Sequence, residues 1–117
     1  MKSNGIKRGI KSQQVNLREI NLQINGLLAT PTATGFDEFG VSEVIDGGTG
    51  LITIVLNRPF LRSDVMVKSI SMITADATAS VVATAADRVT IQAMVAGVDA
   101  DADYFISILG SDFKNKV

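Results

Sequence analysis

The stretch from residue 50 to residue 60 constrains the fold of this chain more than any other. It reads Gly-Leu-Ile-Thr-Ile-Val-Leu-Asn-Arg-Pro-Phe, and every residue from Leu51 to Leu56 except Thr53 is aliphatic. A short apolar run that follows a glycine-rich turn predicts a strand buried on both faces. Pro59 ends the run, because proline has no N–H to give to a sheet ladder. We therefore expect residues 51–57 to form the central strand of a β-sandwich.

The rest of the chain after residue 40 shows the same β signature in short segments. Further strands are predicted at residues 41–46, 65–74, 79–85, 89–96 and 104–109. Val89, Ile91 and Ala93 alternate with Thr90 and Gln92, which is the period of two expected of a strand. Short strands separated by turn residues predict an antiparallel β-sandwich or jelly roll over residues 41–117. The predicted core comprises Val41, Ile52, Ile54, Leu56, Val89, Ile91, Ile106 and Ile108.

Residues 1–30 are open to two interpretations. One is a coiled coil, because six apolar residues and one glutamine recur at the alternating spacing of four and three that is typical of a heptad repeat. These positions are Ile6, Ile10, Gln13, Leu17, Ile20, Ile24 and Leu27. Isoleucine at both heptad positions favours three helices over two, whereas Gly9 and Gly26 are poor helix residues.

The alternative for the same segment is extended chain. Ile20, Leu22 and Ile24 alternate with polar residues, and Asn25-Gly26 is a strong hairpin-turn signal. Under either interpretation we expect an anchoring and oligomerisation segment over residues 1–30, because it precedes the predicted sandwich and needs partner chains to bury its apolar side chains. The expected oligomer interface comprises Ile10, Leu17, Ile20, Ile24 and Leu27.

Residues 31–40 are rich in Thr, Ala, Gly and Pro, and predict a linker between the two parts. Phe36 and Phe39 flank two acidic residues within it. We expect these two rings to pack against the sandwich rather than to bind a ligand.

Charge is divided unevenly along the chain, although the net charge is only −1. Residues 1–18 carry five basic side chains and no acid, whereas the remainder has six basic and twelve acidic residues, a balance of −6. A basic segment on an acidic body indicates docking on an acidic surface, although a solubilising terminus has the same composition. The expected partner-anchoring residues are Lys2, Lys7, Arg8 and Lys11. No aromatic residues are interleaved with them, so nucleic acid is not the expected partner.

The sequence does not indicate a metal site or an enzyme active site. The chain has no cysteine and no histidine, which removes thiolate sites and the commonest general base. Asp99, Asp101 and Asp103 alternate as at the start of a calcium loop, but the sixth and twelfth loop positions hold Tyr104 and Gly110 instead of Gly and Glu. We therefore expect no catalytic residue, no metal and no cofactor.

Localisation rests on two further patterns. No apolar run reaches the roughly 20 residues that a membrane helix needs. Residues 1–11 lack the apolar segment of a signal peptide, so we expect synthesis in a cytosol.

Three segments together carry a resemblance to a known class of protein. They are the strand Gly50–Phe60, the Ala/Thr/Val-rich hairpin at residues 78–96, and the Ala/Asp stretch at residues 98–103, which leads into the segment Tyr104–Asp112. Residues 47–112 thereby resemble the small β-modules of tailed-bacteriophage virion proteins, which occur in head decoration proteins, head fibres and tail fibres.

The resemblance implies a non-enzymatic virion component that assembles as a homo-oligomer, often a trimer. Its N-terminal segment would bind the major capsid protein or another virion protein, and the β-module would point outward. Two alternatives remain open. In one, the chain is a tail-fibre or adhesin tip whose loops, such as residues 98–103, contact a host surface. In the other, it is a cellular oligomeric β-protein unrelated to phage.

Overall fold

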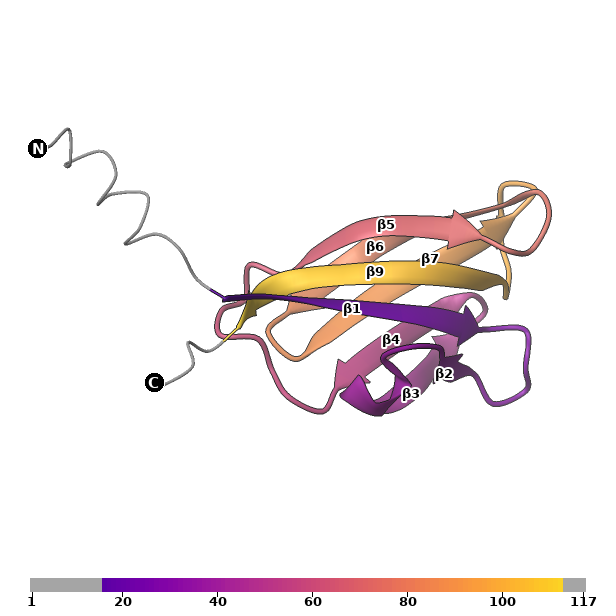
Figure 1. Ribbon diagram of the computed structural model, residues 1–117. Helices are drawn as coiled ribbons and strands as arrows, with labels where there is room; N and C mark the ends of the chain where they lie inside the picture. Colours follow the sequence, from indigo (N-terminus) through magenta and orange to yellow (C-terminus); the bar gives the residue numbers. More distant parts are fainter. Residues whose placement is uncertain (1–15, 113–117) are drawn as a thin grey trace, which may run out of the picture.

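The computed structural model describes residues 16–112, which form two antiparallel sheets (Figure 1). The strands are β1 (Asn16–Asn25), β2 (Thr32–Thr34), β3 (Val41–Gly48), β4 (Leu51–Leu56), β5 (Met66–Met72), β6 (Ala77–Ala85), β7 (Arg88–Val95), β8 (Val98–Asp99) and β9 (Asp103–Asp112). A single 3-10 turn, η1 (Glu38–Gly40), is the one helical element of the described residues. None of these residues therefore forms a helix that is long and apolar enough to cross a membrane.

The two sheets lie one behind the other. The first has the strand order β2-β1-β9-β5, and the second has the order β3-β4-β7-β6 with β8 paired to β7. Figure 1 shows β5, β9 and β1 side by side in the nearer layer, with β6, β7 and β4 behind them. The mainly β prediction is confirmed, and the strand positions after residue 40 agree with the observed elements to within a few residues at most ends.

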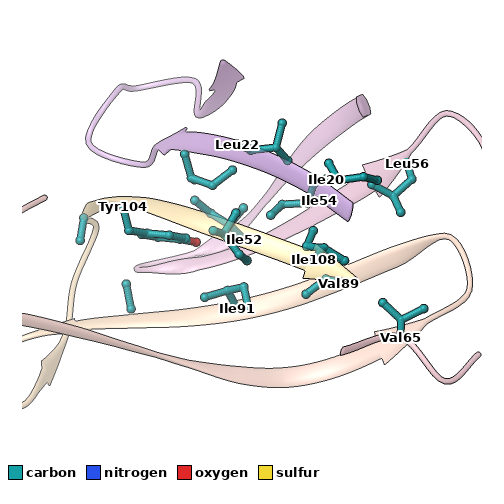
Figure 2. Packing of buried hydrophobic residues seen from close by; sticks show 14 of the residues in the cluster. Ile20, Leu22, Ile52, Ile54, Leu56, Val65, Val89, Ile91, Tyr104 and Ile108 are labelled. Carbon is teal, nitrogen blue, oxygen red and sulfur yellow. The ribbon is translucent and has the colours of Figure 1, made fainter. Parts of the chain in front are cut away.

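A single apolar core fills the space between the sheets. Its central side chains come from β1, β4, β7 and β9, at alternating positions along each strand (Figure 2). Alternation places successive side chains on opposite faces, so each of these strands gives one face to the core. Seven of the eight predicted core residues are buried, and the eighth, Val41, is partly buried against them.

The prediction that residues 51–57 are buried on both faces is wrong, although β4 does lie inside its sheet between β3 and β7. Ile52, Ile54 and Leu56 are buried, whereas the outward side chains from Leu51 to Val55 are half-buried. The reason is that an antiparallel sheet of a two-layer fold has a second layer on one side only. The apolar outer side chains are covered only by their own neighbours.

The helical interpretation of residues 10–28 is wrong for the described part. β1 pairs with β9 along its whole length, from Asn16 opposite Asp112 to Asn25 opposite Asp103. Ile20 and Ile24 fit both periods, and the period of two determines the structure because it places them, with Leu22, on the core. β1 is thus an inner strand of the first sheet.

The predicted boundaries at residues 30 and 40 need the same correction. β1 and β2 belong to the sheet that also contains β5 and β9, so the sandwich body begins at Asn16 rather than at Val41. The expected linker contains β2 and η1. Residues 1–15, which include Ile10 and the basic residues Lys2, Lys7, Arg8 and Lys11, lie outside the described residues.

Candidate functional site

The loop between β2 and β3 holds two phenylalanine rings away from the body of the protein. Phe36 is 96% exposed and Phe39 is 86% exposed. The expectation that these rings pack against the sandwich is therefore wrong. Large apolar side chains left in solvent forgo the free energy of burial, so this loop is a candidate surface for binding.

The backbone of this loop is tied to the body on both sides. On β1, the Asp37 carboxylate accepts a hydrogen bond from the Asn21 N–H at 2.7 Å, and the Asp37 N–H donates to the Asn21 carbonyl at 3.3 Å. Just after β4, the Asn57 N–H donates to the Gly40 carbonyl at 2.9 Å, and the Asn57 side-chain amide donates to the Phe39 carbonyl. The loop is thus held at both ends while its rings stay exposed.

Gly35 sets the direction in which the chain enters the loop. Its φ is +113°, a conformation that L side chains rarely adopt. Its N–H donates to the Glu38 side-chain carboxylate at 3.3 Å, which closes the turn on itself. The turn therefore depends on a glycine at this position.

A groove of about 720 Å³ lies beside this loop, on the outer face of the first sheet. Residues of β1, β9 and β5 line it, and Gly35 and Phe36 form one wall. Phe105 of β9, which is 51% exposed, provides a second aromatic ring in the same groove. Its volume falls in the range of roughly 300–1,000 Å³ that is usual for ligand sites.

Hydrogen bonds join the polar side chains of the groove. The Lys68 ammonium lies 3.0 Å from Glu19 Oε1, and the Ser107 hydroxyl lies 2.5 Å from Asn21 Oδ1 and 3.3 Å from Glu19 Oε2. The hydrogen bond from Lys68, followed by the one from Asn21, holds the pKa of Glu19 below its usual value. Glu19 and Lys68 are therefore a charged pair whose charges cancel.

A second, smaller hollow of about 350 Å³ shares Phe36 with the groove and is also lined by Phe39 and Arg18. The Arg18 guanidinium stacks over the Phe60 ring, 4.4 Å from the ring centroid. Burial is the main cause that lowers the pKa of Arg18. Arg58 Nη2 lies 3.0 Å from Asp112 Oδ2, and Arg18 Nε lies 3.9 Å from the same oxygen. Both arginines thus join the end of β9 to the strands around it.

The five residues predicted as an oligomer interface are not brought together. Ile20 and Ile24 are 4% and 0% exposed inside the chain's own core, so they cannot contact another protomer. Leu17 and Leu27 are exposed, but they lie near opposite ends of β1. Ile10 lies outside the described residues. The heptad interface is therefore wrong for the residues that the structure describes.

The alternating aspartates of residues 99–103 do not form a calcium loop. Asp101 accepts a hydrogen bond from the Gly50 N–H at 2.7 Å, and Asp103 accepts one from the Leu27 N–H at 3.0 Å. These carboxylates thus form hydrogen bonds with the loops that follow β3 and β1. Within residues 16–112, no group of three or more acidic side chains is placed to hold a metal ion.

Strand β6 presents another apolar surface, at the edge of the second sheet. Its nine residues, Ala77–Ala85, carry no charge, and Val81 and Val82 are about half-exposed. Val82 is the extra residue of an irregularity in the pairing with β7, between Val81 and Ala83.

Comparison of the chain with protein-family models, with curated proteins and with solved structures gave no match. The candidate site therefore rests on the geometry described above. The groove was not predicted from the sequence, because its lining comes from strands far apart in the chain. Phe36 and Phe39 were singled out, but their rings were expected to pack against the sandwich.

Proposed function

We propose that this chain is a non-enzymatic structural protein of a tailed-phage virion, which binds the capsid as a decoration or head-fibre protein. In this proposal the basic segment before Asn16 binds an acidic surface of the major capsid protein or another virion protein. The sandwich is then displayed outward. The proposal draws on the resemblance of residues 47–112 and on the separation of basic and acidic charge along the chain.

The observation that carries the proposal is the polarity of the sandwich. Asn16 pairs with Asp112, so the described chain begins and ends at the same end of the body (Figure 1). The loops at residues 26–31, 73–76 and 100–102 lie at the opposite end, because β1 and β5 end there and β9 begins there. A segment attached before Asn16 therefore leaves the opposite loops and the outer sheet faces accessible.

Assembly as a homo-oligomer, with a trimer favoured, is a further part of the proposal. Since Ile20 and Ile24 belong to the core, another surface has to join the protomers. We assign that contact to β6. An edge strand without charged residues is an exception among soluble proteins, which usually protect such edges with charge or cover them.

Co-sedimentation with empty heads of the phage that encodes the chain tests the anchor. The double variant Lys2→Glu and Lys7→Glu is compared with Lys114→Glu and Lys116→Glu, which changes the net charge by the same amount near the other terminus. We expect the first variant to lose binding and the second to retain it. Equal loss in both variants would show a non-specific charge effect and would contradict the assigned anchor.

A second candidate function is that of a tail-fibre or adhesin tip that contacts a host surface. The groove beside Phe36 favours it, since two aromatic rings and several hydrogen-bonding side chains meet there on an open face. In that case binding to host cells would survive the charge reversal at Lys2 and Lys7 and would be lost on changes in the groove.

A further inference from the structure

We propose that the groove on the outer face of the first sheet binds an uncharged oligosaccharide. The inference goes beyond capsid binding, because it uses none of the basic N-terminal residues. Four properties of the groove support it: the order of its side chains, its charge, its difference from a protein interface, and the hydrogen bonds that hold parts of its lining.

The side chains of the groove form two rows across the sheet. The pairing of β1, β9 and β5 gives the rows Asn21–Ser107–Ser69 and Gln23–Phe105–Ser71. Amides and hydroxyls both donate and accept hydrogen bonds, as sugar hydroxyls do. Sugar rings also have apolar C–H faces, which stack on aromatic rings, and Phe105 and Phe36 offer such rings. The groove thus offers contacts both to the hydroxyl groups and to the apolar faces of a sugar.

The charge of the groove selects for a neutral ligand. Its two charged lining residues are Glu19 and Lys68, which pair with each other at 3.0 Å. An anionic ligand such as a nucleic acid or an acidic lipid would meet the Glu19 carboxylate without an unpaired cation to offset it. An uncharged sugar can hydrogen-bond to both members of the pair without separating them.

The lining also differs from that of a protein–protein interface. The centres of such interfaces are depleted in serine, lysine and glutamate, which together provide five of the twelve lining residues here. The two aliphatic residues of the lining, Leu22 and Ile106, are themselves buried in the core. A second copy of this chain would therefore bury seven polar side chains in the groove.

Hydrogen bonds hold the backbone of the Phe36 loop and the Asn21 side chain in place before any ligand binds. Asp37 ties the Phe36 loop to the backbone of Asn21, and the Ser107 hydroxyl holds the Asn21 side chain at 2.5 Å. Preorganised side chains lose little conformational freedom on binding, which favours affinity for a flexible ligand. The weak affinity expected for an open groove would be raised by multivalent display on an oligomer.

The test is binding of the full chain to an array of bacterial surface glycans, followed by NMR titration with the oligosaccharide that binds best. Phe36→Ala and Phe105→Ala should each weaken binding about fivefold, because an aromatic contact contributes on the order of 1 kcal/mol. Phe39→Ala is the matched control, since Phe39 lies on the same loop but outside the groove, and it should change affinity less than twofold. Thermal unfolding of each variant shows that the fold is kept.

Three results would overturn the proposal. The first is an array on which the unaltered chain binds no glycan better than the Phe36→Ala/Phe105→Ala double variant. The second is equal loss of binding in Phe39→Ala, which would place the ligand outside the groove. The third is a dimer in sedimentation that Phe105→Ala dissociates, which would make the groove a contact between copies. None of these results bears on the capsid anchor, which the Lys2 and Lys7 variants test separately.

Discussion

Ile24 of β1 lies directly opposite Tyr104 of β9, and both side chains are fully buried. This pair joins a segment near the start of the chain to its last strand. Because both residues lie inside the core, β1 is an integral part of the sandwich rather than an extension of it. β1 therefore cannot be part of the proposed anchoring segment, which we assign to residues before Asn16.

Replacing Ile24 with alanine should destabilise the protein by about 2–5 kcal/mol, since it removes a buried side chain and leaves a cavity. The matched control is Leu17→Ala on the same strand, where the side chain is 65% exposed, and its effect should stay within about 0.5 kcal/mol. Urea unfolding at two protein concentrations measures both. A loss of stability in Ile24→Ala that appears only at low concentration would instead indicate that Ile24 joins protomers.

Tyr104→Phe should keep or increase stability. The Tyr104 hydroxyl is buried and has no hydrogen-bond partner among the described residues, and a buried unsatisfied group costs about 1–3 kcal/mol. The denaturant midpoint of the variant should therefore equal or exceed that of the unaltered chain. A clear fall in the midpoint would show that the hydroxyl forms a stabilising contact.

Tyr104 also makes stability depend on pH at the alkaline end. Burial raises the pKa of Tyr104, so the folded state disfavours the phenolate. The contribution is complete below the unfolded pKa, near 10, and it is lost as the pH rises toward the folded pKa. Tyr104→Phe should remove this part of the alkaline loss of stability.

Several features of the fold could be predicted from the sequence, because each is encoded locally. The alternation of Val89, Ile91 and Ala93 identifies β7, and the Gly-rich turn before Leu51 identifies the β3–β4 hairpin. β1 could not be decided from periodicity alone. Ile20 and Ile24 are four residues apart, which is compatible with a helix face and with one face of a strand.

The candidate site could not be predicted because it depends on contacts distant in sequence. Phe36 lines the same groove as Phe105 only because β1 pairs with β9 and Asn21 holds the loop. The composition of residues 31–40 indicated a linker, but it could not show that the loop would be hydrogen-bonded to Asn21 and Asn57 while both rings stay exposed.

Removing Lys68 from its ion pair in the groove should change the pKa of Glu19. Lys68 lowers the pKa of Glu19, so the contribution of the pair to stability is present above the unfolded pKa and is lost as the pH falls through the folded pKa. Lys68→Met should raise the pKa of Glu19 toward its usual value of 4.5. NMR titration of the Glu19 carboxyl carbon measures this. An unchanged pKa in the variant would show that the pair does not form in solution.

The edge strand β6 gives a prediction for assembly. Val82 is 57% exposed, so Val82→Lys should leave the thermal stability nearly unchanged while placing a charge on the proposed contact between protomers. Sedimentation should then show a smaller assembly than that of the unaltered chain. Val98→Lys on β8 is the control, since Val98 is at least as exposed but lies outside β6. A mass that is the same in all three proteins would rule out β6 as the contact.

Hydrogen exchange of the backbone amides of β1 tests the central claim most directly. If β1 is an inner strand of the body, its central amides should exchange as slowly as those of β9, to which it is paired, because both then open only with the whole sandwich. Exchange of the amides of residues 20–24 at the rate of an unfolded peptide, while β9 stays protected, would contradict the account.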